Sequence, residues 1–260
     1  MPELNGKGWI LMSLTFTELA AFIDHAVLSP TATLDDILSA CRMGAQYQVA
    51  VVCVRPSDVP IAANVLQCTR TKTGTVIGFP HGTTSTAGKV TEAQQAIKDG
   101  ARELDMVLNI GRLLSDDRTY VENDIRAVCE VAHAQRVLLK VIFETCYLSD
   151  NQKIIACELC TKAGVDYVKT STGFGPRGAT LSDIILMRNH ISPGMGIKAS
   201  GGLRTLDDVL AALACGATRI GTSSTEKILE EAKGREAKGQ LREMSFQEAW
   251  ADQKKPSSKR

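Results

Sequence analysis

The sequence predicts an α/β protein, a single-domain (β/α)8 TIM barrel, on three observations. Short runs of β-branched and other apolar residues recur eight times along the 260-residue chain. Segments with helical spacing lie between these runs, and strands that alternate with helices are typical of parallel sheets. No Gly-x-Gly-x-x-Gly sequence follows the first or second run. A doubly wound open sheet, the alternative fold, usually carries that dinucleotide-binding sequence, so the closed barrel is favoured.

The predicted strands recur at intervals of roughly 25 to 35 residues, with a helical segment between each pair. They lie at residues 22–25, 49–54, 75–79, 103–108, 137–143, 165–172, 196–200 and 218–221. In residues 206–213, apolar side chains fall at positions i, i+3, i+4 and i+7, which is the spacing of one helix face. Several helices are expected to end in a left-handed cap at a glycine before the next strand, namely at Gly44, Gly100, Gly164 and Gly216.

The barrel is expected to span residues 14–232, between two segments of weaker pattern. Residues 1–13 form an N-terminal extension without periodicity. Residues 233–260 are rich in Lys, Glu and Gln and end in Lys-Lys-Pro-Ser-Ser-Lys-Arg. This composition is typical of a charged, solvated tail that lacks fixed structure.

The overall composition argues against several classes of function. A formal net charge of +1 and an aromatic content of 5% argue against a nucleic-acid partner. No run approaches the ~18 apolar residues of a membrane span, and no signal peptide is visible, so we expect a cytoplasmic protein without a membrane partner. The eight cysteines are interpreted as reduced packing thiols. Cys157 and Cys160 have Cys-x-x-Cys spacing but no second ligand pair, so they predict no metal site.

Two lysines, Lys169 and Lys198, lie in strand-like runs where apolar side chains are usual. Burial of an ammonium group costs several kcal/mol unless the group is paired or loses its proton. A neutral lysine amine can form an imine with a carbonyl compound. Lys140 and Asp105 also lie in strands, and an internal salt bridge remains an alternative explanation for that pair. It does not explain the set, because three lysines would share one carboxylate.

Repulsion between neighbouring lysines would lower the pKa of one of them. At ~5 Å and an effective dielectric constant of ~20, two ammonium groups repel by roughly 3 kcal/mol, or about two pKa units. Desolvation acts in the same direction. One lysine would then be the nucleophile, its neighbour the activating charge, and Asp105 a proton shuttle. The pattern therefore predicts imine chemistry without a cofactor.

Small and hydroxyl-bearing residues follow the last three predicted strands, at 171–175, 200–202 and 221–224. Such loops let backbone N–H groups converge on an anion, and the hydroxyls add further donors. Barrels commonly hold phosphate at the loops after strands seven and eight. The three loops together predict a phosphate-binding site.

Six motifs, in order and at barrel spacing, resemble the deoxyribose-phosphate aldolase family of class I (Schiff-base) aldolases. They are Ile23-Asp24-His25 and the segments 76–82, 103–107, 139–145, 168–173 and 196–202, and the resemblance covers about residues 16–225. It implies reversible cleavage of 2-deoxy-D-ribose 5-phosphate to D-glyceraldehyde 3-phosphate and acetaldehyde. It also implies that no metal is needed, because the imine is the electron sink. A homodimer or higher homo-oligomer is the family expectation.

The resemblance also implies roles for individual residues. Lys169 corresponds to the Schiff-base lysine, Lys198 to the lysine that lowers its pKa, and Asp105 to the proton-relay acid and base. Glu144 is interpreted as an orienting partner of Lys140. The expected substrate-binding residues, including those for phosphate, are Asp24, Cys53, Lys140, Thr170, Gly173, Gly201, Gly202, Ser223 and Ser224.

The chain departs from many relatives at several positions. Ala26 and Ser29 stand where many relatives have threonine and lysine, and Phe174 replaces a lysine after the phosphate-loop glycine. Arg177 is an alternative source of that charge. The chain ends in Arg260 rather than in the tyrosine of some relatives. These departures leave open another lysine-imine sugar-phosphate aldolase or a transaldolase-like enzyme. A non-catalytic phosphate-binding barrel is disfavoured by the two lysines and Asp105.

The two histidines of the first and third strand-to-helix loops are possible acid–base groups by residue type. His25 directly follows Asp24, and His81 lies in the sequence Phe-Pro-His-Gly. We interpret both as residues that shape these loops or form hydrogen bonds within them.

Overall fold

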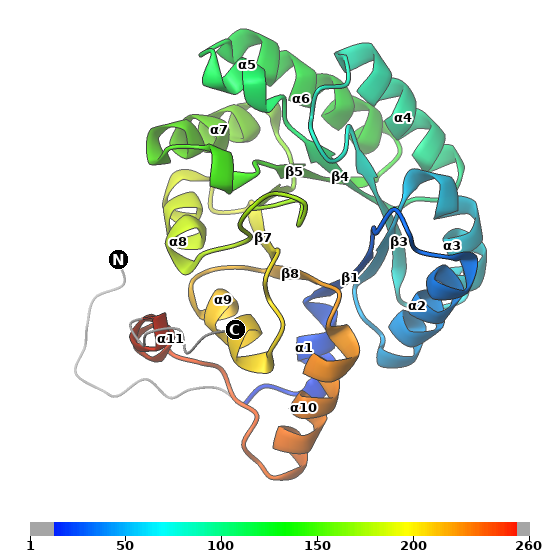
Figure 1. Ribbon diagram of the computed structural model, residues 1–260, viewed down its shortest axis with the longest axis vertical. Helices are drawn as coiled ribbons and strands as arrows, with labels where there is room; N and C mark the ends of the chain where they lie inside the picture. The colour runs from blue at the N-terminus through cyan, green and yellow to red at the C-terminus, as the bar shows by residue number, and fades with distance from the viewer. Residues whose placement is uncertain (1–12, 254–260) are drawn as a thin grey trace.

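The computed structural model describes residues 13–253 and contains a closed barrel of eight parallel strands (Figure 1). The strands are β1 (Ile23–Val27), β2 (Val51–Val54), β3 (Lys72–Ile77), β4 (Glu103–Val107), β5 (Leu138–Ile142), β6 (Tyr167–Lys169), β7 (Gly196–Ser200) and β8 (Arg219–Thr222). Each strand pairs with the next in chain order, and β8 pairs with β1 to close the ring. The predicted (β/α)8 barrel is confirmed.

Helices follow the strands and surround the barrel (Figure 1). They are α1 (Phe16–Ala21), α2 (Leu34–Tyr47), η1 (Pro56–Asp58), α3 (Val59–Leu66), α4 (Thr86–Lys98), α5 (Ile110–Leu114), α6 (Arg118–Ala134), η2 (Thr145–Tyr147), α7 (Asp150–Ala163), α8 (Leu181–His190), α9 (Leu206–Ala214), α10 (Thr225–Ala237) and α11 (Phe246–Gln253). Thr33 caps α2 and Thr205 caps α9, and in each case an acidic residue three positions later reaches back to the cap.

Three of the four glycines expected at helix ends have a positive φ there, but Gly44 does not end its helix. Gly44 lies inside α2, which ends at Tyr47 with Gln48 in the left-handed conformation at φ 55°. A Cβ atom at residue 44 would lie 2.4 Å from Cγ2 of Val52 in β2. The glycine is therefore required for close packing between helix and strand, which the cap interpretation missed.

The boundary expected at residue 233 falls inside α10, which continues to Ala237. After this helix the chain forms α11, which packs against α9 (Figure 1). Leu241 and Ala249 are buried, so residues 233–251 are not the solvated tail that their composition indicated. A few apolar anchors fix this segment, and their effect is hidden by the surrounding Lys, Glu and Gln residues. Residues 1–12 and 254–260 lie outside the described part of the chain.

Alternation along each strand divides the interior into two regions. On β4, Leu104 and Met106 pack outward into the main core beneath the helices, whereas Glu103 and Asp105 form ion pairs with side chains of other strands inside the barrel. The lumen is apolar beside β2 and β3, where Cys53 packs with two valines. The other strands supply the charged side chains. None of the helices described between residues 13 and 253 is long and apolar enough to cross a membrane.

Candidate active site

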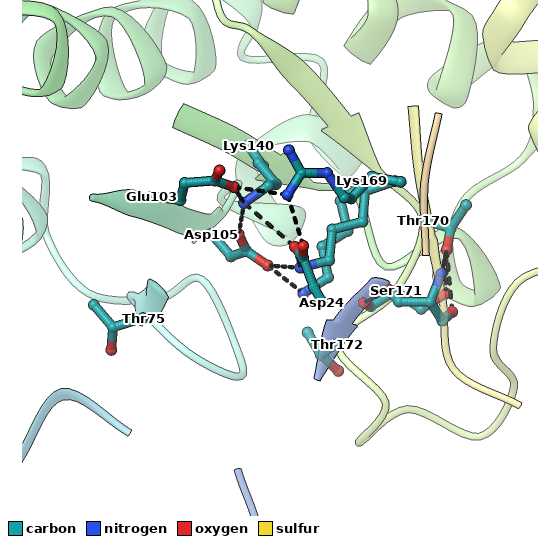
Figure 2. Close-up of polar contacts among 12 residues, drawn as sticks. Asp24, Thr75, Glu103, Asp105, Lys140, Lys169, Thr170, Ser171 and Thr172 are labelled. Atoms are coloured by element: carbon teal, nitrogen blue, oxygen red, sulfur yellow. Dashed lines mark hydrogen bonds and ion pairs between the residues drawn. The ribbon is translucent and has the colours of Figure 1, made fainter. Parts of the chain in front are cut away.

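A network of ion pairs occupies the lumen (Figure 2). It joins four buried cations to three carboxylates of the described residues: Lys140, Lys169, Lys198 and Arg219 with Asp24, Glu103 and Asp105. A fifth cation, the half-exposed Lys72 on β3, lies at the edge of this network, with its Nζ 3.9 Å from Oε1 of Glu103. The prediction that three lysines share one carboxylate is therefore wrong, because Asp24 and Glu103 also face the lysines. The cations still outnumber the carboxylates. This excess positive charge is the condition under which one lysine can lose its proton.

Asp105 on β4 is the centre of the network. Its Oδ1 accepts a hydrogen bond from Nζ of Lys140 at 3.0 Å, and its Oδ2 lies 2.7 Å from Nζ of both Lys169 and Lys198. Burial raises the pKa of the Asp105 carboxyl, but the charges of the three lysines outweigh burial and hold the pKa well below its usual range. Asp105 is therefore ionised at neutral pH.

Lys169 and Lys198 are in register on neighbouring strands but differ in their partners. Burial and the positive charge of Lys198 lower the pKa of Lys169 against the opposing effect of Asp105. Lys198 has a second carboxylate, Asp24, whose Oδ2 lies 2.5 Å from its Nζ. Burial also disfavours the charged form of Lys198, but Asp105 and Asp24 outweigh this effect and raise its pKa. Lys169 is therefore the lysine of the pair that more readily becomes a free amine.

Lys140 on β5 is fully buried beneath this pair. Its Nζ lies 2.5 Å from Oε2 of Glu103, 3.0 Å from Oδ1 of Asp105 and 3.5 Å from Oδ2 of Asp24. Burial opposes the charged form, but the three carboxylates raise the pKa of Lys140 well above its usual value. The salt bridge with Asp105 that the sequence left open is present. Lys140 does not reach the cavity wall, so the structure does not support its predicted contact with substrate.

A cavity of about 790 Å³ opens above the two upper lysines. Its wall contains seven of the predicted site residues, Cys53, Lys169, Lys198, Gly173, Gly201, Gly202 and Ser223. Five others do not line it, Asp24, Asp105, Lys140, Thr170 and Ser224. The buried Cys53 thiol has a pKa raised to about 11, first by burial and then by Asp105, so it is an uncharged wall residue.

A glycine next to Lys198 provides the room for this arrangement. A Cβ atom at Gly221 on β8 would lie 2.8 Å from Cβ of Ser200 and 3.1 Å from Cε of Lys198. A larger residue at position 221 would therefore push Lys198 away from its two carboxylates.

Comparisons with known proteins now identify the family. A sequence model described as DeoC/LacD family aldolase matches residues 19–230. The chain belongs to this aldolase family. The deoxyribose-phosphate aldolase of Thermococcus gammatolerans is 50% identical over 221 residues, which are 84% of this chain and 98% of that protein. The deoxyribose-phosphate aldolase of Clostridium perfringens (strain 13 / Type A) is 48% identical over 213 residues, 82% of this chain and 95% of that protein.

Solved structures of aldolases agree with this family membership. A putative deoxyribose-phosphate aldolase from Coccidioides immitis superposes with a TM-score of 0.82 at 41% identity, covering 85% of this chain and 88% of the other. The deoxyribose-phosphate aldolase from Aeropyrum pernix, described as a unique tetrameric structure, has a TM-score of 0.79 at 33% identity. That match covers 84% of this chain and 92% of the other.

In this DeoC/LacD family aldolase, the glycine loops form one side of the cavity. Gly173, Gly201 and Gly202 have φ values of 89°, 83° and 82°, which other residues rarely adopt. Thr170, which lies behind the loops, joins two of them: its hydroxyl donates to the carbonyl of Ser200 and accepts from the N–H of that residue, each at 3.1 Å (Figure 2). Thr170 therefore holds the loops in position and does not itself line the cavity.

Glu144 also fixes the loop after β6. It accepts hydrogen bonds from the backbone N–H and the hydroxyl of Thr172, and it is buried. Its interpretation as an orienting partner of Lys140 is therefore wrong. Residue spacing could not distinguish a contact with Lys140 from one with Thr172, because Glu144 has a left-handed backbone conformation at φ 54° that the spacing does not reveal.

Two residues were considered for the departures in the predicted phosphate-binding loop, Phe174 and Arg177. Phe174 is half-exposed in the cavity wall and meets the edge of Phe79 at a centroid distance of 5.3 Å. Arg177 does not line the cavity, and its Nη1 lies 3.7 Å from Oδ2 of Asp183. Arg204, which the sequence reasoning missed, does line the cavity. Its position two residues after Gly201-Gly202 was the available signal.

The two histidines singled out by the sequence occupy different places. His25 is buried in the cavity wall, with its Nδ1 2.9 Å from Oγ1 of Thr225. Burial lowers the pKa of His25 to about 4, so the ring is neutral at pH 7. His81 is exposed and lies outside the cavity wall. Ala26 and Ser29 line the cavity, so the departures in the first loop face the cavity.

Proposed function

We propose that this chain is a deoxyribose-phosphate aldolase that cleaves 2-deoxy-D-ribose 5-phosphate reversibly to D-glyceraldehyde 3-phosphate and acetaldehyde through a Schiff base on Lys169. The observation that carries the proposal is Lys169 itself. It is a cavity-lining lysine with a lowered pKa, 2.7 Å from an ionised carboxylate and in register with a second, charged lysine. Relatives that match over most of their length carry the same enzyme name.

The first stage forms the imine. The neutral amine of Lys169 adds to C1, the aldehyde carbon of the open-chain sugar, and loss of water gives an iminium ion. The Asp105 carboxylate lies between the amino groups of Lys169 and Lys198, so it can relay protons between them and water in the cavity. Its negative charge also stabilises the iminium ion.

The second stage breaks the C2–C3 bond. A base removes the proton of the C3 hydroxyl, the bond electrons move to C2 and are delocalised onto the iminium nitrogen, and D-glyceraldehyde 3-phosphate leaves. Protonation of the enamine at C2 and hydrolysis of the imine release acetaldehyde and restore Lys169. The iminium nitrogen is the electron sink, so the proposed route needs neither a metal nor a cofactor.

The phosphate is proposed to bind at the opposite end of the cavity, where Gly173, Gly201, Gly202 and Ser223 line the wall. Ser224 stands at the N-cap position of α10 without a side-chain capping bond, and the N-terminus of this 13-residue helix adds a favourable dipole there. Arg204 provides positive charge that Phe174 cannot supply. A phosphate held at this end leaves the aldehyde carbon to reach Lys169.

The proposed setting of the enzyme follows from the same relatives. We propose a homo-oligomer, since the Aeropyrum pernix protein is described as tetrameric. The eight free cysteines support a reducing compartment such as the cytoplasm.

Reductive trapping tests the proposed mechanism. Incubation with acetaldehyde and cyanoborohydride is expected to leave an ethyl group on Lys169, located by peptide mass spectrometry, and to inactivate the enzyme. Cleavage of 2-deoxy-D-ribose 5-phosphate is expected to be unchanged after treatment with a metal chelator. An unmodified Lys169, or activity lost in chelator, would refute the Schiff-base mechanism. Trapping without cleavage of this sugar would favour another lysine-imine aldolase.

A further inference from the structure

Glu103 and Arg219 lie in the lumen one layer below the residues that reach the cavity. Oε2 of Glu103 is 2.5 Å from Nζ of Lys140 and 3.3 Å from Nη1 of Arg219. The same Nη1 donates a hydrogen bond to Oδ1 of Asp24 at 2.8 Å. Both side chains are largely buried, and neither lines the cavity. They therefore touch the site only through Lys140 and Asp24.

We propose that Glu103 and Arg219 are positioning residues that fix the charges of Lys140 and Asp24 and so set the pH at which Lys169 becomes a free amine. The inference deepens the proposed function and rests on its Schiff-base mechanism. Two chains of contacts carry it. One runs from Glu103 through Lys140 to Oδ1 of Asp105, and the other from Arg219 through Asp24 to Lys198.

The first chain keeps Asp105 available to the upper lysines. Lys140 has Glu103 as its nearest carboxylate, at 2.5 Å against 3.0 Å for Asp105. Lys140 can therefore approach Asp105 through Oδ1 alone, which leaves Oδ2 to Lys169 and Lys198. Without the negative charge of Glu103, Lys140 would depend on Asp105 and Asp24, and the lumen would carry one more unit of positive charge.

The second chain orients Asp24. Arg219 takes Oδ1 of Asp24, so Oδ2 is directed to Lys198 at 2.5 Å. The Arg219 guanidinium also lies over the ring of Tyr167 at 5.4 Å, which holds it in the lumen. Without the positive charge of Arg219, the negative charge of Asp24 would be shared by Lys198 and Lys140 alone. The net positive charge around Lys169 would then fall by one unit.

The charged and titratable groups around Lys169 come from all seven other strands. Asp105 (β4), Lys198 (β7) and Cys53 (β2) are its nearest titratable neighbours, and Asp24 (β1), Lys140 (β5), Glu103 (β4) and Arg219 (β8) form the surrounding network. The half-exposed Lys72 (β3) lies 3.9 Å from Glu103 at the edge of this network. Glu103 and Arg219 have opposite charges and no contact with the cavity. Neutralising each one should therefore move the ionisation of Lys169 in opposite directions.

The test is the pH profile of kcat/KM for two neutralising variants and two charge-preserving controls. In Glu103→Gln, the acid limb is expected to move to lower pH by ~0.5–1 unit, because a nearby negative charge no longer favours the ammonium form. In Arg219→Met, the acid limb is expected to move to higher pH by a similar amount. Glu103→Asp and Arg219→Lys keep the charges, so their limbs are expected to stay close to that of the wild type.

The pH dependence of cyanoborohydride trapping on Lys169 provides a second readout that is independent of sugar cleavage. It should show the same opposite shifts. Shifts in one direction for both variants, or no shift in either folded variant, would overturn the inference. If one variant does not fold, a wild-type profile in the other variant would be enough to reject it. Failure of the wild type to trap acetaldehyde would instead reject the proposed Schiff-base function.

Discussion

Lys89 and Lys169 are both buried lysines, but their surroundings differ in the balance of charge. Lys89 on α4 lies outside the barrel wall, where its Nζ is 2.6 Å from Oδ2 of Asp124 and donates to the carbonyl of Val107 at 3.0 Å. Thr86 donates a hydrogen bond to the other carboxylate oxygen, so this ion pair is fully satisfied. Lys169 shares the single oxygen Oδ2 of Asp105 with a second lysine.

The difference between these two sites is the balance of charge and not burial, and the proposed reactivity of Lys169 depends on that balance. Lys89 has its own carboxylate, Asp124, and does not line the cavity. Lys169 is buried among more cations than carboxylates and lines the cavity. The two lysines therefore differ in how many cations share the carboxylate that each one contacts, and the proposed role of Lys169 rests on this difference.

Removal of Lys169, which shares Asp105 with Lys198, should have the largest effect on catalysis. Lys169→Leu is expected to lower kcat/KM by about 10⁴-fold or more, because no other amine occupies its position to form the imine. Circular dichroism and thermal unfolding should show a folded barrel, since Asp105 keeps Lys140 and Lys198 as partners. Substantial turnover in a folded Lys169→Leu variant would assign the nucleophile to a different residue.

Removal of the fully paired Lys89 should reduce stability and leave catalysis nearly unchanged. Lys89→Met leaves Asp124 buried without its cation, and the expected loss in the free energy of unfolding is about 3–5 kcal/mol. Urea denaturation measures this loss, and kcat/KM of the folded fraction is expected to stay within about threefold of the wild type.

A matched control separates charge from packing at this pair. The double variant Lys89→Met with Asp124→Leu removes both charges and should recover most of the lost stability. A single variant that keeps wild-type stability but loses activity would show that Lys89 acts on the active site, and the comparison with Lys169 would then fail.

The sequence predicted most of the fold because the eight β-branched runs specify strands locally. It also predicted that Lys169, Lys198 and Asp105 are site residues, because a charged residue inside a strand is unusual, and the structure brings these three side chains together. Glu103 and Arg219 lie at the starts of their strands, where charged residues commonly face solvent. Only closure of the ring brings β4 and β8 together across the lumen.

Lys89 was missed for a different physical reason. A lysine in an amphipathic helix usually faces solvent, and the spacing of α4 does not reveal that position 89 faces Asp124 on α6. Glu144 shows the same limit at the site, because its contact with Thr172 depends on the backbone turn after β5. Contacts between segments far apart in the chain therefore could not be predicted from local sequence patterns.

Lys198 differs from both lysines, since it contacts two carboxylates, Asp24 and Asp105, but shares Asp105 with Lys169. Removal of its charge in Lys198→Met should raise the pKa of Lys169, because a nearby cation no longer opposes the ammonium form. Below that pKa the fraction of free amine falls tenfold per pH unit. The acid limb of kcat/KM is therefore expected to move up by about 1–2 pH units, with a loss of about 10–100-fold near pH ~7.

Activity of Lys198→Met should recover in part as the pH rises, because the free amine of Lys169 then returns. Lys198→Arg keeps the positive charge and provides the control, with an acid limb expected close to that of the wild type. If Lys198→Met lost activity by the same factor at every pH, its charge would not be what activates Lys169. Lys198 would then have to act directly on the substrate. The contrast between a fully paired and a shared lysine would still hold for Lys89 and Lys169, but the activating charge would have to come from Lys140 or Arg219.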